Sequence, residues 1–220
     1  HLSYMLSNIK KGDDVITSSI TAEPTNTTIL QSGANPVFAD ICEFTGNITL
    51  DSIKRVFTKK TRAICVVHYG GYPAEIIKIK NFAKKNKVIL IEDCAHALGS
   101  KYKNNYVGSF GDFAIFSFQA IKHITTIDGG VLVIKNKSIM DRAKRMRWFG
   151  LQKGIERSKN RIRELGYKYN MSNVSASLGI HQLKYINYFL NIYVRNGHYY
   201  NKQLNKSSIF TPVKIIENAK

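Results

Sequence analysis

Two residues within Val88 to Val133 have types that together could do covalent chemistry. Asp93 directly follows the apolar run Val88 to Glu92, and Lys122 comes four residues after the apolar run FAIFSF. A lysine amine can condense with an aldehyde, and a carboxylate beside a pyridine nitrogen keeps that nitrogen protonated, so the ring accepts electrons. The pair therefore indicates a pyridine aldehyde cofactor, provided that the fold brings the two side chains together.

Alternating strands and helices are expected to position this pair. The segment after Pro73 has apolar residues at helical spacing, with the proline suited to the first turn. This alternation predicts an α/β fold with a mostly parallel sheet flanked by helices. In such a sheet ligands bind beyond the carboxyl ends of the strands, which is where Asp93 stands. Four short runs rich in Val and Ile suit its buried strands: Asp14 to Thr17, Pro36 to Ala39, Ala63 to His68 and Val88 to Glu92.

Downstream of Asp93 the pattern changes several times. The Gly- and Asn-rich passage 100–112 predicts a hairpin-like excursion, and the runs FAIFSF and GGVLVIK predict further strands. Residues 150–166 are polar and basic, which indicates a loop or a mobile lid. Helical spacing returns over 171–204, where Ser172 offers an N-cap to a long helix. We therefore expect a large cofactor-binding domain over 1–170 and the start of a smaller domain over 171–220.

Both ends of the chain suggest a piece of a longer protein. The first residues, from His1, read as the end of a helix, and the last stretch, FTPVKIIENAK, reads as the opening of another element. There is no apolar run of roughly 20 residues and no secretion leader, which favours a cytoplasmic protein without a membrane segment. The three cysteines lack the spacing of a zinc site or a disulfide framework and are expected to be reduced core thiols, so no metal is predicted.

The strong basic charge allows a nucleic-acid partner. The chain has 33 Lys and Arg against 15 Asp and Glu, a net charge of +18. However, the basic residues are scattered through expected helices and form no recognisable nucleic-acid module. No nucleic-acid role is therefore predicted, and an anionic cofactor and substrate would also be attracted by this charge.

The sequence motifs around the lysine and the carboxylate resemble those of the DegT/StrS family of nucleotide-sugar aminotransferases, which are fold-type I pyridoxal-phosphate enzymes. The family pattern reads approximately EDxAHxxGxxYxxxxVGSFGDxxxFSFxxxKxxxxxxGG. The resemblance extends over nearly the whole chain, from KKGDDVITSSIT to LGYKYNMSNVSASLGIHQL. Within the central block the matching residues are Glu92, Asp93, Ala95, His96, Gly99, Tyr102, Val107 to Asp112, Phe116 to Phe118, Lys122, Gly129 and Gly130.

The resemblance implies pyridoxal 5′-phosphate as cofactor and a role for each matching side chain. Lys122 would carry the cofactor as a Schiff base and move protons between the substrate carbon and the cofactor. Asp93 would pair with the pyridine nitrogen, His96 would lie against the ring or its phenolic oxygen, and Ser117 would contact the phosphate. The alternatives are purely structural roles: a strand cap for Asp93, a packed imidazole for His96 and a buried strand serine for Ser117.

Some positions depart from the family pattern. Ala22 stands where many relatives stack an aromatic ring on the cofactor, so the ring-stacking residue is unassigned. Lys168 stands where many relatives have an asparagine that reaches the cofactor phosphate of the neighbouring subunit. The lysine could bind that phosphate as a point charge or be solvated. The family's phosphate-binding turn at a helix N-terminus would lie before His1.

The implied reaction is transfer of an amino group, from glutamate, to the 4-keto group of a 4-keto-6-deoxy nucleotide sugar, by a homodimer with shared active sites. One alternative is a sugar dehydratase that uses pyridoxamine phosphate, but such relatives replace the Schiff-base lysine with histidine. Here Lys122 is present, and His123 merely follows it. The other alternative is a non-catalytic basic relative that regulates or binds nucleic acid. A salt-resistant complex without cofactor would favour it.

Overall fold

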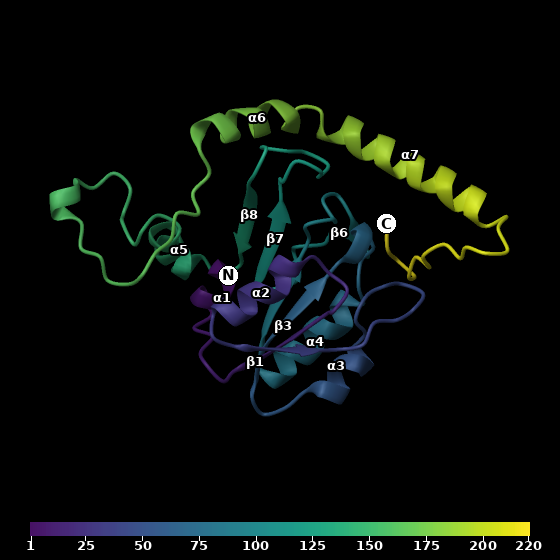
Figure 1. The fold of residues 1–220 in the computed structure, drawn as a ribbon, viewed down its shortest axis with the longest axis horizontal. Coiled ribbons are helices and arrows are strands. Elements are labelled where there is room, and N and C mark those ends of the chain that lie inside the picture. Colours follow the sequence, from purple (N-terminus) through teal and green to yellow (C-terminus); the bar gives the residue numbers. More distant parts are fainter.

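A six-stranded sheet forms the centre of the computed structural model, which describes residues 1–220. The strand order is β2-β1-β3-β4-β7-β8 (Figure 1). The first five strands run parallel, and β8 pairs antiparallel with β7. The predicted α/β class and mostly parallel sheet are therefore confirmed. The strands are β1 (Asp14–Thr17), β2 (Asn35–Phe38), β3 (Thr61–Val67), β4 (Ile89–Asp93), β7 (Phe113–Ser117) and β8 (Gly130–Ile134).

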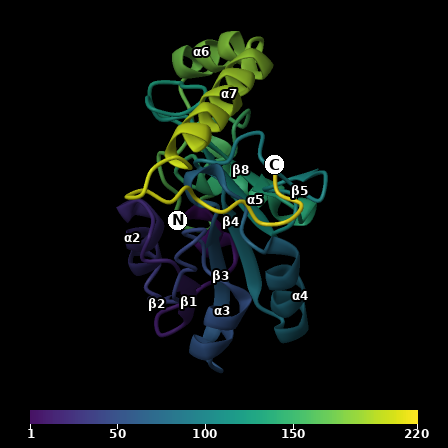
Figure 2. The same ribbon diagram turned by 90° about the vertical axis from the view of Figure 1, so that its right-hand side faces the viewer.

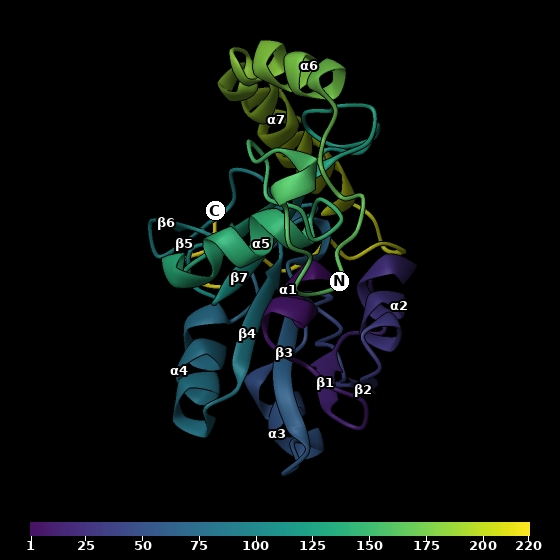
Figure 3. The ribbon, with the colours of Figure 1, turned by 90° about the vertical axis from the view of Figure 1, so that its left-hand side faces the viewer.

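Helices cover both faces of the sheet, because successive strand residues point to opposite sides. On one face, Ile64 and Leu90 pack with α3 (Leu50–Val56) and α4 (Ile76–Asn86). On the other face, Cys65 and Ile91 pack with three helices, α1 (Leu2–Leu6), α2 (Glu23–Gln31) and α5 (Met140–Met146). All three are labelled in Figure 3, and Figure 2 shows two of them, α2 and α5, from the opposite side. Burying each large aliphatic side chain in these two cores contributes roughly 1.5–3 kcal/mol relative to leaving it exposed.

The connection from β3 to α4 differs from the prediction at Pro73. The helix begins at Ile76, so the proline lies outside its first turn. The backbone N–H of Ala74 donates to His68 Nδ1 at 3.1 Å, which holds this segment in a non-helical path. The expected helix itself is present, and it ends at Asn86, where the following residue, Lys87, has a left-handed conformation.

The predicted hairpin excursion is confirmed as β5 (Lys101–Tyr102) and β6 (Asn105–Tyr106). Lys103 and Asn104 both have positive φ angles, of 48° and 63°. Positive φ at both central residues is the geometry of the type I′ turn that suits two-residue hairpins.

The C-terminal helical region consists of two helices, α6 (Asn173–Leu183) and α7 (Ile186–Leu204), so the prediction of one long helix is wrong. Figure 1 shows them beyond the carboxyl ends of the parallel strands. Ser172 does cap α6, because its hydroxyl accepts a hydrogen bond from the N–H of Ser175. Residues 150–166 form a loop with one 3-10 turn, as expected. The mobility of this loop and the domain boundary at residue 170 stay predictions.

Two further expectations can be compared with the structure. All three cysteines are free thiols, but Cys42 is only partly buried, whereas Cys65 and Cys94 lie in the core. Cys42 lies in a turn where its N–H donates to the carbonyl of Asn47, which keeps it near the surface. No helix of the structure combines the length and the apolar composition that crossing a bilayer requires.

Candidate active site

A cavity of about 520 Å³ opens at the carboxyl ends of β3, β4 and β7, and four of the five predicted site residues line it. Asp93 is the last residue of β4, and Ser117 is the last residue of β7. His96 follows three residues after Asp93, and Lys122 comes from the connection between β7 and β8. The fold thus brings Lys122, Asp93, His96 and Ser117 to one site, although they come from different segments.

Two hydrogen bonds from different elements fix the Asp93 carboxylate. Its Oδ2 accepts from the hydroxyl of Thr25 at 2.8 Å, and its Oδ1 accepts from the backbone N–H of Ala95 at 3.0 Å. An ionised carboxylate can accept about four hydrogen bonds. Asp93 therefore keeps acceptor capacity on both oxygens for a cationic N–H group in the cavity.

Thr25 is a site residue that the sequence did not reveal. It lies in the first turn of α2, 68 residues before Asp93, and its hydroxyl is also 2.9 Å from the hydroxyl of Thr21. The spacing of four residues between the two threonines was the available signal, because it lets both side chains meet at the start of a helix. Nothing in the sequence pointed to the carboxylate as their partner.

The Lys122 amine is partly withdrawn from water. Burial lowers the pKa of Lys122, while the negative charge of Asp93 acts in the opposite direction. A lowered pKa increases the fraction of neutral amine, which is the nucleophilic form. The structure therefore favours a lysine that can react with a carbonyl group.

The His96 imidazole is held toward its neutral form. Burial and the positive charge of Lys122 lower the pKa of His96, against a smaller opposing effect of Asp93. Its ring lies edge-on to that of Tyr69, at 6.2 Å between centroids. A neutral ring of this kind can contact an aromatic ligand without adding charge to the site.

The Ser117 hydroxyl accepts a hydrogen bond from the N–H of Gln119 at 3.3 Å and faces the cavity from the end of β7. Lys168, by contrast, does not line this cavity. Its Nζ lies 4.9 Å from the centroid of the Trp148 ring and donates to Asn170 at 2.9 Å. A role for Lys168 in a neighbouring subunit stays a prediction.

The donor set fits pyridoxal phosphate. Lys122 offers an amine with a lowered pKa, Asp93 offers an oriented carboxylate with free lone pairs, and both border a cavity large enough for a small aromatic ring. Ala22 also lines the cavity and offers only a methyl group where many relatives have an aromatic side chain. Three lining residues carry aromatic rings, His1, Tyr4 and His96, and His96 is the one that the family pattern marks for contact with the cofactor ring.

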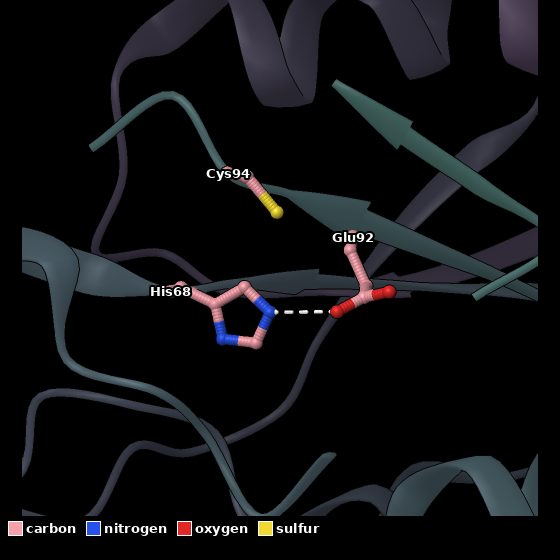
Figure 4. Close-up of side chains that lie close together, drawn as sticks. All are labelled: His68, Glu92 and Cys94. Carbon is pink, nitrogen blue, oxygen red and sulfur yellow. Dashed lines mark hydrogen bonds and ion pairs between the residues drawn. The ribbon is translucent and has the colours of Figure 1, made fainter. Parts of the chain in front are cut away.

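A second cluster, His68, Glu92 and Cys94, lies next to the cavity but on the other face of the sheet, and its atoms are within 4.8 Å of one another (Figure 4). His68 Nδ1 accepts from the N–H of Ala74, so the proton is on Nε2, which donates to Glu92 at 3.1 Å. Glu92 accepts three more hydrogen bonds, from the N–H groups of Gly108, Phe110 and Gly111.

These contacts assign the cluster a structural role. The four N–H donors use the full acceptor capacity of the Glu92 carboxylate. Burial strongly raises the pKa of Cys94, which keeps its thiol protonated. A metal ion would have to displace these hydrogen bonds. Glu92 instead ties the glycine-rich turn of residues 108–111 to the sheet, while its neighbour Asp93 points to the opposite face and into the cavity.

The fold and the cavity define a class of protein: an α/β domain with a partly buried lysine and an oriented carboxylate beyond the carboxyl ends of its parallel strands. The family model of the DegT/DnrJ/EryC1/StrS aminotransferase family matches residues 1–220. The chain belongs to this family, and the resemblance seen in the sequence is confirmed.

Curated relatives include two with named activities. The chain is 38% identical over 218 residues to a UDP-4-amino-4,6-dideoxy-N-acetyl-beta-L-altrosamine transaminase of Campylobacter jejuni, which covers 98% of the chain and 57% of the relative. It is 36% identical over 205 residues to the GDP-perosamine synthase of Escherichia coli O157:H7, which covers 93% and 56%. An uncharacterized protein of Methanocaldococcus jannaschii is 41% identical over 191 residues, covering 84% and 50%. The chain spans about half the length of these curated relatives.

Solved structures show the same fold. The aminotransferase TlmJ of Streptoalloteichus hindustanus superposes with a TM-score of 0.93 at 28% identity, over all of the chain and 59% of that structure. A Streptococcus pneumoniae protein described as a sugar aminotransferase, in its PLP form, gives a TM-score of 0.74 at 29% identity, over 84% and 52%. The fold is therefore that of known aminotransferases.

Proposed function

We propose that the protein transfers an amino group, from glutamate, to the 4-keto group of a 4-keto-6-deoxy nucleotide sugar, with pyridoxal phosphate bound covalently to Lys122. One observation carries the proposal: the amine of Lys122 and the carboxylate of Asp93 line the same cavity. The family membership and the PLP form of a related structure support the choice of cofactor.

Each side chain has a separate role in this reaction. When bound, pyridoxal phosphate supplies an electron sink that makes a proton on the neighbouring substrate carbon removable. Lys122 would hold the cofactor through its aldehyde carbon until the amino group of the donor displaces the lysine, and the freed amine would then move that proton from the substrate carbon to the C4′ carbon of the cofactor. Asp93 accepts the hydrogen bond of the protonated pyridine nitrogen, with its oxygens oriented by Thr25 and Ala95.

The remaining predicted residues have supporting roles in the proposal. His96 contacts the ring as a neutral imidazole, and Ser117 donates a hydrogen bond to the phosphate. Lys168 reaches the phosphate in the site of a partner subunit of a homodimer, where a lysine acts as a point charge. The exposed position of Lys168, away from the cavity of its own chain, is compatible with this role. Location in the cytoplasm is part of the same proposal.

The substrate class is supported by relatives and by charge. The name of the Campylobacter relative contains a UDP-linked 4-amino-4,6-dideoxy sugar, and that of the Escherichia relative contains a GDP-linked sugar. The net charge of +18 favours an anionic substrate such as a nucleotide diphosphate sugar. A transaminase also fits better than a dehydratase, because position 122 is a lysine and covalent binding of the aldehyde requires an amine.

The test uses the intact protein with pyridoxal phosphate, glutamate and a 4-keto-6-deoxy nucleotide sugar, and detects the aminosugar by mass spectrometry. We expect the parent protein to form product and Lys122→Ala to form none. Product formation by Lys122→Ala at the parent rate would refute the assignment of the lysine. Tight, salt-resistant binding of nucleic acid without any product would instead support the nucleic-acid-binding alternative.

A further inference from the structure

We propose that Gln182 on α6 is a positioning residue, which holds the connection that carries Lys122 by accepting a hydrogen bond from the backbone N–H of Thr125. The proposal rests on the proposed function, because it concerns how Lys122 is presented to the cofactor. Lys122 lies in the connection of residues 118–129 between β7 and β8. Figures 1 and 3 show this connection extending from the sheet toward α6.

The contact between α6 and the connection is direct. Gln182 Oε1 lies 2.8 Å from the Thr125 nitrogen, although the two residues are 57 positions apart. On the preceding turn of the helix, a Cβ on Gly179 would come within 2.9 Å of Thr126 Cγ2, so the helix and the connection touch. Ile124 and Thr126, on either side of Thr125, are 2% and 1% exposed. The middle of the connection is therefore packed where Gln182 reaches it.

The connection has few other attachments. Its internal hydrogen bonds close its base, as between the Phe118 N–H and the Gly129 carbonyl at 2.8 Å. The Lys122 N–H donates to the Gln119 carbonyl within the same connection. Of the hydrogen bonds made by residues 118–129, the one to Gln182 is the one that reaches beyond the two strands and their connection.

A second contact supports the same arrangement. The ring of His123, the residue after Lys122, lies edge-on to the ring of Tyr193 on α7, with 4.7 Å between centroids. Both C-terminal helices therefore contact the segment that directly follows Lys122. Removing the Gln182 acceptor would leave the Thr125 N–H without a partner and give the lysine a more mobile, more hydrated position.

The experiment measures covalent attachment of pyridoxal phosphate to Lys122 in the intact protein. The adduct is trapped with borohydride at several pH values and located by peptide mass spectrometry. Gln182→Met keeps the length of the side chain but removes the acceptor, Gln182→Glu keeps an acceptor, and Ser177→Ala on the exposed face of α6 is the control. We expect attachment to be roughly three- to tenfold slower in Gln182→Met, as for loss of one hydrogen bond, and parental in the other two variants.

The pH profile separates positioning from a general loss of structure. A more hydrated Lys122 loses the burial that lowers its pKa, so the pH midpoint of attachment should rise in Gln182→Met. An unchanged rate and midpoint in Gln182→Met would overturn the inference while leaving the proposed function standing. The absence of any Lys122 adduct in the parent protein would overturn both. Amide hydrogen exchange in the parent protein is a test that needs no variant. If the Thr125 amide exchanges as fast as a solvent-exposed amide, the inference is also overturned.

Discussion

The substitution Glu92→Gln tests whether the buried cluster beside the cavity is structural. Glu92 is 0% exposed and accepts four N–H hydrogen bonds, two on each oxygen. Glutamine replaces one of these oxygens with an NH2 group, which donates instead of accepting. Whichever way the amide turns, two N–H groups that now have an acceptor would face another donor.

A change in the tautomer of His68 cannot remove this clash between donors. His68 cannot give up the proton on Nε2 by moving it to Nδ1, because Nδ1 accepts the N–H of Ala74. Each hydrogen bond to a buried charged group contributes about 1.5–3 kcal/mol, and two of the four would be lost. We therefore expect Glu92→Gln to reduce the free energy of unfolding by about 3–5 kcal/mol.

Urea denaturation of the intact protein near neutral pH measures this difference, with the exposed Glu156→Gln as a matched control expected to change little. The pH dependence gives a second check. Burial raises the pKa of Glu92, but the contacts with His68 and the N–H groups of Gly108 and Gly111 outweigh it, so the folded-state pKa lies below its ordinary value. The stabilisation is thus present above the unfolded pKa of about 4.3 and is lost as the pH falls through the folded pKa. The difference in the free energy of unfolding between parent and variant should therefore become smaller in acid. A difference below about 1 kcal/mol at neutral pH would refute the structural role.

Three further substitutions address the site and its supports. Thr25→Val removes a donor to Asp93 and should weaken pyridoxal phosphate binding about tenfold in an absorbance titration; an unchanged affinity would contradict the role of this hydroxyl. Gly111→Ala would place a Cβ 2.8 Å from each of two backbone carbonyl oxygens, so thermal unfolding should show a loss of about 2 kcal/mol, and parental stability would show that the turn can move. Ser172→Ala removes the N-cap of α6 and should cost about 1 kcal/mol in urea denaturation, whereas an equal or greater stability would mean that the cap is not needed.

The strands and the hairpin could be predicted from the sequence because local patterns determine them. Short runs rich in Val and Ile marked the strands, and the Lys103–Asn104 pair sits at a two-residue turn between β5 and β6. The position of Asp93 at the end of β4 also followed from its run. The prediction of one long helix failed where the sequence carries no local breaking signal. The break between α6 and α7 falls at Lys184 and Tyr185, which include neither glycine nor proline.

The candidate site was predictable to a similar degree. The lysine, the carboxylate, His96 and Ser117 were found through their family pattern, and the structure places them around one cavity. Thr25 and Gln182 were missed, because each acts through a hydrogen bond to a residue 57 or more positions away. A single sequence gives no direct signal for such a long-range contact.

A structure of the intact protein with pyridoxal phosphate tests the central claim most directly. We expect continuous density from Lys122 Nζ to the aldehyde carbon of the cofactor, with the Asp93 carboxylate within hydrogen-bonding distance of the pyridine nitrogen. A cofactor attached to another residue, or one whose pyridine nitrogen lies away from Asp93, would contradict the account.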